Sequence, residues 1–373
     1  MKKNILNLNY FAVVLIIVKS MLHYSTLIIL PDTIESLIEL LAYFIWGITL
    51  LTSRYKKKYI LTLFVCGGIC LYSCYICKSF IIFSSFMFFC LCMSRNSDEK
   101  EIIKIVYKTI LMVLIVHFIF FEIQYLSGNI VKLMDHTGRI RFTLGFSNPN
   151  IVSYYTLWCF LGYVYCNQGI LEKKKKLILP ISLILIVYLF TKSNTLIFMS
   201  ISSMILFKIK ISQKILKIIC KYIIITISIV WIIMVNLYAR GNSFALKLND
   251  TLNSRLYYSY ETEKRYGYTM LGKNINMDVG LNREKSYMST SLILDVTYAN
   301  LLYKYGIVYI FILNIISSII ANSKDEKKMK CLIIWSIFAL SETVSLNFII
   351  CFSPILGAFA LKDRGTLDVK KDN

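Results

Sequence analysis

Long apolar runs separated by short polar stretches dominate the chain. Because a membrane-crossing helix needs about 20 apolar residues, each run of about that length predicts one crossing. The 36 residues between Lys58 and Arg95 would form a helix of about 54 Å, too long for a hydrocarbon core of about 30 Å. We therefore predict turns near Lys78 and at Lys192-Ser193-Asn194. The pattern then predicts twelve segments, at roughly 9–30, 34–52, 59–76, 79–94, 101–126, 146–168, 175–191, 193–208, 216–238, 290–321, 329–344 and 346–361.

Basic residues are distributed so as to predict the topology. Lysine clusters occupy alternate loops, whereas the short loops between them carry only Lys78, Lys132, Arg139, Arg141 and Lys192. By the positive-inside rule we expect a multi-pass plasma-membrane protein with both termini cytoplasmic. The net charge of +21 could suggest nucleic-acid binding, but the lysines lie in short clusters between apolar runs and form no continuous groove, so we predict no nucleic-acid partner.

The composition agrees with a membrane protein and argues against a metal site built from cysteines. Hydrophobic residues make up 57% of the chain, well above a soluble protein. The eleven cysteines lie almost wholly in apolar segments, and no histidine joins them at ligand spacing. We therefore interpret them as packing residues and predict no metal site.

The predicted fold class is an all-α integral membrane protein of about twelve transmembrane helices with one large extracytoplasmic loop. Residues 1–238 hold the first nine segments and an arginine-bearing outer loop at 127–147. Residues 239–289 form the large, partly helical outer loop, and a loop of this length is typically functional. Residues 290–373 hold the last three segments and a short basic cytoplasmic tail.

Arginine is sorted to the predicted outer side. Six of the nine arginines fall there: Arg139, Arg141, Arg240, Arg255, Arg265 and Arg283. A guanidinium binds phosphate through two parallel hydrogen bonds, which a lysine cannot do, so the sorting predicts an anionic ligand such as a pyrophosphate at the lipid surface. The alternative is that these arginines bind lipid headgroups or loop carboxylates.

The turn that follows Arg141 predicts a capped helix. Ser147 or Asn148 can cap it, Pro149 fits its first turn, and Asn150 follows. Its N–H groups, beside Arg139 and Arg141, would form an anion site. The alternative is an ordinary capped membrane helix whose arginines extend to the interface.

Asp295 lies near the outer start of the tenth segment, with Tyr298, Leu302 and Tyr305 at helical spacing. A carboxylate at a membrane entrance is a functional candidate, and burial or a neighbouring arginine could tune it as a base. The alternative is an interfacial ion pair with an arginine or a lysine. Four further polar residues inside apolar segments could line a cavity or simply pair: Lys19, His117, Glu122 and Glu342.

Two motifs resemble a known family. The pattern R-x-R-F-x-x-G-F-x-N-P-N at 139–150 resembles an element of bacterial polysaccharide repeat-unit polymerases (Wzy type) and the related O-antigen ligases. The pattern D-x-x-Y-x-N-L-L-Y-x-Y-G at 295–306 resembles the element after the large outer loop of Gram-positive capsule polymerases, and Arg255 starts a similar helix between them. Asp295-Val296 stands where ligases typically carry His-Asn, which favours a polymerase. Ser193-Asn194-Thr195 departs from the S-R-[TG] of many relatives: either Lys192 substitutes for that positive charge, or this position does not bind phosphate.

The resemblance implies glycosyl transfer between undecaprenyl-diphosphate-linked oligosaccharide repeat units, with no metal and no other cofactor. Asp295, Arg141 and Arg255 would be catalytic, and the substrate-binding residues would be Arg139, Asn148, Asn150, Tyr298, Lys192 and Arg265. Partners would be the lipid-linked oligosaccharide, membrane lipids, a flippase and a chain-length regulator. Lysine- and isoleucine-rich usage, with the motif variants, suggests a Gram-positive source.

Other classes remain open. An O-antigen-ligase-like transferase is the nearest enzymatic alternative. A polytopic transporter or flippase for lipid-linked oligosaccharide is the second, for which Lys19 is the best feature, although the polar residues concentrate in two outer loops rather than in symmetric halves. A third alternative is a non-catalytic membrane scaffold, but such a role would not explain why arginine is concentrated on the outer side.

Overall fold

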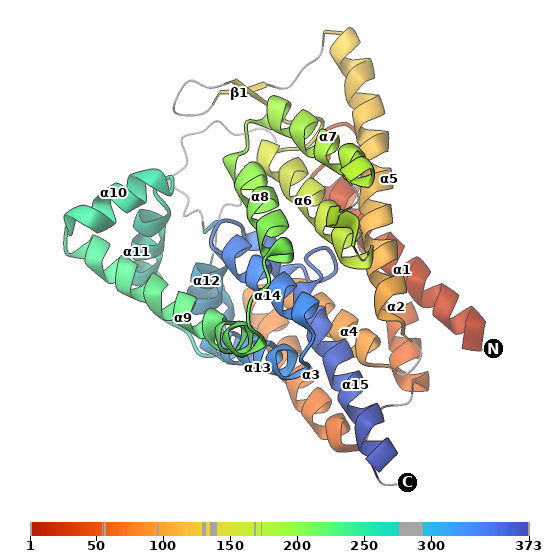
Figure 1. Ribbon diagram of the computed structural model, residues 1–373. Helices are drawn as coiled ribbons and strands as arrows, with labels where there is room; N and C mark the ends of the chain where they lie inside the picture. Colours follow the sequence, from red (N-terminus) through yellow and green to blue (C-terminus); the bar gives the residue numbers. More distant parts are fainter. Residues whose placement is uncertain are drawn as a thin grey trace. The chain divides into compact units, whose positions relative to one another are not determined.

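The computed structural model describes residues 2–53, 55, 57–94, 97–128, 132–134, 140–167, 169–172, 174–275 and 294–371, and it is almost wholly helical (Figure 1). The chain divides into two compact units. Unit 1 comprises Met1–Arg54 and Leu91–Lys210, and unit 2 comprises Tyr55–Cys90 and Ile211–Asn373. Within the described residues four helices are long and apolar enough to cross a membrane: 32–52, 59–77, 99–126 and 213–239. The all-helical class is thus confirmed, and these helices are compatible with a membrane protein.

Unit 1 is organised around α6 (Pro149–Cys166), which packs against α5 (Glu99–Leu126), α7 (Lys174–Thr191) and α8 (Asn194–Lys208). Nearly every α6 side chain is buried, as expected of an apolar helix surrounded by others. α1 (Lys2–His23) packs against α2 (Asp32–Thr52) and α5. A two-stranded antiparallel hairpin, β1 (Lys132–Met134) and β2 (Ile140–Phe142), leads to α6, and a short 3₁₀ turn (Ile170–Glu172) follows it.

Unit 2 is organised around α9 (Gln213–Ala239), which packs against α11 (Arg255–Tyr266), α13 (Ile307–Asn322) and α14 (Glu326–Phe338). The buried residues of α9 recur every three or four positions and so form one face. The remaining elements are α3 (Lys57–Cys77), α4 (Ile81–Met93), α10 (Ser243–Thr251), α12 (Thr297–Asn300), a π turn (Leu301–Tyr305), 3₁₀ turns at Thr343–Leu346 and Ser353–Ile355, and α15 (Leu356–Lys371).

Both predicted hairpin turns are confirmed. α3 ends at Cys77 and α4 begins at Ile81, with Lys78 at φ +48° between them. α7 ends at Thr191 and α8 begins at Asn194, with Lys192 at φ +52°. A left-handed residue reverses the chain within two or three positions, which joins antiparallel helices closely.

Several predicted segments are not helical over their whole length: α1 ends at His23 within 9–30, and α14 ends at Phe338 within 329–344. The segment at 290–321 is broken into α12, the π turn and α13, and Gly306 at φ +105° separates the last two. The segment at 346–361 becomes helical only from Leu356. In addition, the 239–289 loop, predicted to be partly helical, forms the two helices α10 and α11, separated by Asn253 and Ser254 at positive φ.

The loop between α1 and α2 is fastened to the segment before α6. The backbone N–H of Thr26 donates to the Gly145 carbonyl at 2.8 Å, and that of Ser147 donates to the Tyr24 carbonyl at 2.8 Å. His117 lies beneath this pairing, fully buried, with its ring stacked on Phe146 at 4.4 Å. Its Nε2 lies 2.9 Å from the Ser25 hydroxyl oxygen, which already accepts from the backbone N–H groups of residues 27 and 28. The Ser25 hydroxyl therefore donates its hydrogen bond to Nε2 of His117, and Nδ1 of His117 donates to the carbonyl of residue 113.

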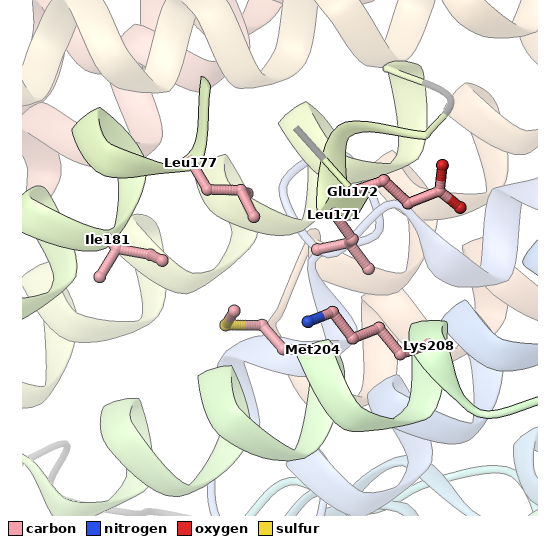
Figure 2. A pocket seen from close by; sticks show the side chains of 6 residues that line it. All are labelled: Leu171, Glu172, Leu177, Ile181, Met204 and Lys208. Atoms are coloured by element: carbon pink, nitrogen blue, oxygen red, sulfur yellow. The ribbon is translucent and has the colours of Figure 1, made fainter. Parts of the chain in front are cut away.

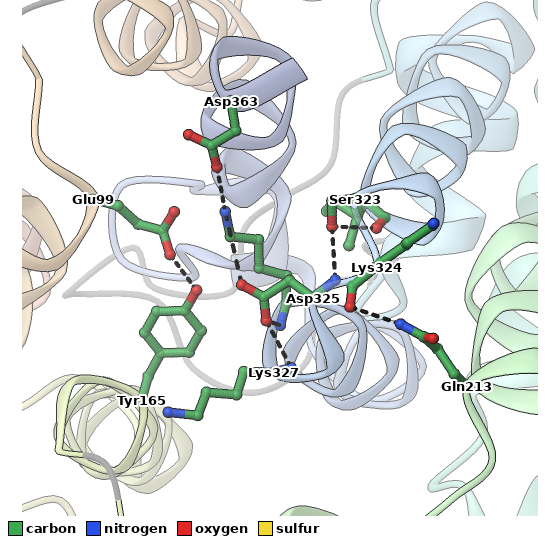
Figure 3. Close-up of polar contacts among 10 residues, drawn as sticks. Glu99, Tyr165, Gln213, Ser323, Lys324, Asp325, Lys327 and Asp363 are labelled. Carbon is green, nitrogen blue, oxygen red and sulfur yellow. Dashed lines mark hydrogen bonds and ion pairs between the residues drawn. The ribbon is translucent and has the colours of Figure 1, made fainter. Parts of the chain in front are cut away.

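Charged side chains also occur within the helical packing. In unit 2 the largely buried Lys328 lies with Nζ 3.2 Å from an Asp363 oxygen and 3.9 Å from an Asp325 oxygen (Figure 3). These contacts join the start of α14 to α15. Because a buried ammonium is costly without a partner, the two carboxylates explain how Lys328 is accommodated.

Unit 1 contains a second charged group, between α1 and α2. Lys19 Nζ lies 3.3 Å from Glu39 and 4.0 Å from Glu35, and His23 Nδ1 lies 2.7 Å from Glu35. The Tyr43 hydroxyl donates to Glu39 at 3.0 Å. Lys19, which the sequence placed within an apolar segment, is therefore paired.

Candidate functional site

The arginine of the first motif, Arg141, lies on β2 and is held by unit 1. Its Nε donates to the Thr191 carbonyl at 2.7 Å, and its Nη2 donates to Asn150 Oδ1 at 2.7 Å. Thr191 ends α7 and Asn150 lies in the first turn of α6, so one guanidinium joins three elements. Ser153 on α6 adds a hydroxyl contact to Thr191 at 3.2 Å.

The start of α6 matches the predicted cap. Asn148 is the N-cap, its side-chain oxygen accepts from the Asn150 backbone N–H at 2.9 Å, and Pro149 opens the helix. Lys192 is exposed and directly follows Thr191, whose carbonyl binds Arg141. The structure therefore brings Arg141, Asn148, Asn150 and Lys192 to one end of unit 1. Arg139 lies outside the described residues.

In unit 2, Arg255 is the first residue of α11. Asn249 precedes it and accepts from the Tyr257 backbone N–H at 3.0 Å, while Ser254 enters the helix at φ +62°. The Arg255 Nε is buried and has no hydrogen-bond partner among the described residues, and the same is true of the Ser259 hydroxyl. Ser259 is one helical turn from Arg255, so both unpartnered groups lie on one side of α11. A buried unpaired donor is costly, so both groups are available to a bound water or to a bound anion.

Asp295 precedes α12 and is positioned by Asn300. The Asn300 amide donates to the carbonyl of Leu294 at 2.6 Å and to that of Val296 at 3.1 Å. These two bonds hold the backbone on both sides of Asp295 against α12. Asn300 was not among the predicted site residues, although it stands within the second motif.

The pKa of Asp295 is raised above its ordinary value of 3.8, because the surrounding chain removes part of the hydration of its carboxylate. The positive charge of Arg255 acts in the opposite direction and lowers the pKa. Asp295 itself stays exposed at the surface of unit 2. An accessible carboxylate with a raised pKa, on which the charge of Arg255 acts, is suited to accept a proton beside developing negative charge.

Close backbone packing fixes the segment between Asp295 and α13. The Lys273 backbone N–H donates to the Lys304 carbonyl at 2.9 Å, and the Ile307 N–H donates to the Thr269 carbonyl at 2.8 Å. A Cβ at Gly306 would lie 2.3 Å from the Met270 carbonyl oxygen, so only glycine fits. The π turn thus rests on the strand-like stretch that follows α11, and such turns are frequent at functional sites.

Two predicted substrate-binding residues have other surroundings. Tyr298 is fully buried, and its hydroxyl donates to the Ser336 carbonyl of α14 at 3.1 Å, so it supports α12 from within the core. Arg265 is exposed on α11 and lies 3.4 Å from Glu261, an ordinary surface pair one turn away. The partners of these two side chains are therefore Ser336 and Glu261, not Arg255 or Asp295.

Sequence reasoning missed Asn300 and Ser259. The only signal for Asn300 was its place within the second motif, and Ser259 gave the signal of a small polar residue one turn after Arg255 on an otherwise tyrosine-rich helix. Within the described ranges no group of three or more histidine, cysteine or acidic side chains is placed to hold a metal ion.

Comparison with known proteins found no match. The chain matches no protein family, no curated protein and no solved structure.

Proposed function

We propose that the protein is a membrane enzyme that polymerises oligosaccharide repeat units carried on a lipid diphosphate. The donor is a growing glycan on undecaprenyl diphosphate, and the acceptor is one further lipid-linked repeat unit. The reaction takes place at the outer face of the plasma membrane, where the arginine-bearing segments of both units are proposed to lie. The proposal rests on the two motifs and on the chemistry of Arg255 and Asp295.

The proposed step is a single displacement at the donor's anomeric carbon. A hydroxyl oxygen of the acceptor sugar forms the new bond to that carbon, and the bond from the carbon to the diphosphate oxygen breaks. The bonding electron pair leaves with the lipid diphosphate, whose growing charge Arg255 neutralises. Asp295 takes the hydroxyl proton. Because the diphosphate is already a good leaving group, the step uses no nucleotide sugar.

One observation carries the proposal: the buried and unpartnered Nε of Arg255, on the same side of α11 as the unpartnered Ser259 hydroxyl and electrostatically coupled to Asp295. A phosphate oxygen would accept from both groups. An arginine whose donors were all satisfied within the protein would give no reason to expect an anion there.

An O-antigen-ligase-like transferase remains the nearest alternative, with a different acceptor. A transporter for lipid-linked oligosaccharide is a second candidate, and the charged group of Lys19, His23, Glu35 and Glu39 between α1 and α2 favours it. Ionisable side chains packed between apolar helices commonly mark a transport pathway. In this structure they are paired with one another, which also suits a structural role.

The test is a reconstituted membrane supplied with a synthetic diphosphate-linked repeat unit as the only substrate. Extracted lipids are separated by size for wild type, Asp295→Asn and Arg255→Lys. We expect a ladder of longer glycans from wild type and its loss in both variants. Arg240→Lys is the matched control, because Arg240 is an exposed arginine at the end of α9. Transfer of the intact repeat unit across the bilayer without a ladder would overturn the proposal and favour the transporter.

A further inference from the structure

A cavity of about 580 Å³ lies in unit 1 between α7 and α8, at the ends remote from the turn that joins them. It is lined by Leu171, Glu172, Leu177, Ile181, Met204 and Lys208 (Figure 2). Leu177 and Ile181 are one turn apart on α7, as Met204 and Lys208 are on α8, so the two helices face each other across it. None of these residues belongs to the sites described above.

A proline and a tyrosine keep this end of α7 in place. Pro180 lies inside α7 and has no N–H, so it cannot bond to the carbonyl of Lys176 four residues earlier. The Tyr163 hydroxyl of α6 donates to that carbonyl instead, at 3.3 Å. A helix with a proline in its interior is prone to bend there, and this contact fixes its first turns against α6. The opening beside α8 is therefore built into the packing.

The cavity is amphipathic. Its wall consists of four apolar side chains, and its two charged residues are Glu172 in the 3₁₀ turn and Lys208 at the end of α8. Both are exposed, and no ion pair joins them in the described part of the chain. Figure 2 shows the Lys208 ammonium extended toward Leu171 and Met204, while the Glu172 carboxylate points elsewhere. The rim thus carries a cation extended over the apolar wall and, at a separate point, an anion turned away from the other lining side chains.

We propose that this cavity binds one zwitterionic glycerophospholipid with a primary ammonium headgroup, of the phosphatidylethanolamine type. An acyl chain lies along Leu177, Ile181 and Met204, the phosphate lies at Lys208, and the ammonium lies at Glu172. The site requires that the helices lie in a membrane, and it is independent of the glycosyl transfer proposed above.

The charge pattern favours this lipid over the two other common classes. An anionic lipid such as phosphatidylglycerol would bring a phosphate to Lys208, but it has no cationic group to pair with the Glu172 carboxylate. A choline headgroup carries the same net charge, but its methylated nitrogen has no N–H to donate to that carboxylate. Each exposed charge contact is worth about 0.5–1 kcal/mol, so the loss of either should weaken binding about 2- to 5-fold.

The test uses the full-length protein in vesicles of phosphatidylethanolamine, phosphatidylcholine and phosphatidylglycerol in equal parts. The protein is extracted gently, and the lipids retained per chain are identified by native mass spectrometry. We expect phosphatidylethanolamine to be enriched on wild type, and the enrichment to fall about 2- to 5-fold in Lys208→Gln and in Glu172→Gln. The double variant Ile181→Trp with Met204→Trp, which places two indoles across the cavity, should abolish it.

Matched controls separate this site from general lipid contact. Lys210→Gln removes an exposed lysine two residues from Lys208, and Leu179→Trp adds an indole to the exposed side of α7; neither residue lines the cavity. Both should retain the wild-type enrichment, as should Asp295→Asn, which removes the proposed transfer activity. Equal retention of all three lipids by wild type would overturn the proposal. So would enrichment that survives the double tryptophan variant, provided that variant melts like wild type.

Discussion

Arg141 in unit 1 and Arg255 in unit 2 are two of the arginines whose outward sorting first suggested an anion site, yet they are held differently. Arg141 uses Nε and Nη2 on the Thr191 carbonyl and the Asn150 side chain. Arg255 keeps its Nε buried with no partner among the described residues, and its charge acts on Asp295. Arg141 joins elements of its own unit, whereas the Nε–H of Arg255 has no acceptor among the described residues.

The difference separates two uses of the same side chain. An arginine with satisfied donors contributes to stability and to the placement of its neighbours, here the start of α6 and the end of α7. An arginine with an unmet buried donor lowers stability until something binds it. We therefore assign the larger effect on activity to Arg255 and the larger effect on stability to Arg141.

The largest expected effect is on activity. Arg255→Ala should lower the rate of ladder formation about 10²- to 10³-fold, as for the loss of one donor to developing negative charge. Its melting temperature should stay near that of wild type or rise, because a buried unpaired group is removed. Rates in reconstituted membranes and a thermal melt measure the two effects. A fall in melting temperature together with a full rate would reverse the roles given to the two arginines.

The next effect is on stability. Arg141→Ala removes two hydrogen bonds within unit 1 and should destabilise the protein by about 1–3 kcal/mol. Arg141→Lys should recover part of this loss, because an ammonium can reach only one of the two acceptors well. Thermal melts in detergent, with Arg240→Ala as the exposed control, measure the difference. Equal melting temperatures for Arg141→Ala and the control would show that the two bonds contribute nothing.

The pH dependence sharpens the comparison. Asp295 accepts a proton only when ionised, so the rate should fall as the pH falls through its pKa, which is raised above 3.8. Arg255 lowers that pKa, so Arg255→Gln should move the acidic limb of its remaining activity to higher pH. Arg141→Gln should leave the limb unchanged. Rate profiles of kcat/KM from pH 4 to pH 9 check this, and a limb that persists in Asp295→Asn would assign it to another group.

The smallest effect concerns the cap of α6. Asn148→Ala removes the side-chain acceptor for the Asn150 N–H and should cost about 1 kcal/mol, whereas Asn148→Ser should cost less. Because Asn150 also binds Arg141, the cap and the arginine should be coupled in a double-mutant cycle. Strictly additive losses would show that the cap does not position Asn150 for Arg141.

The sequence predicted correctly those features that depend on residues close together in the chain. The turns at Lys78 and Lys192 and the Asn148 cap follow from helix length, lysine placement and capping chemistry, and all three are present. The break at Gly306 was missed because an apolar run looks the same whether or not it is continuous. What fixes that break is the approach of Met270, a contact across more than thirty residues.

Long-range partners also explain what could not be predicted of the candidate site. The Thr191 carbonyl lies fifty residues after Arg141, and no spacing rule connects them. Tyr298 has the helical spacing of a ligand-facing residue, but the position of Ser336 on α14 decides that it is buried. The sequence predicted only that some neighbouring arginine could tune Asp295. The identity of that arginine, Arg255, and the role of Asn300 both require the fold.

The pairing of residues 24–26 with residues 145–147 constrains the order in which unit 1 can be completed during synthesis. About 120 residues separate the two stretches, so at about 5–20 residues per second the first waits roughly 6–24 s for the second. Through that interval the α1–α2 hairpin lacks both backbone bonds, and the Phe146 ring that stacks on His117, the partner of Ser25, has not yet been made. The N-terminal hairpin is therefore a late-closing part of the protein although it is made first, and a nascent chain stopped before α6 should still expose it to protease.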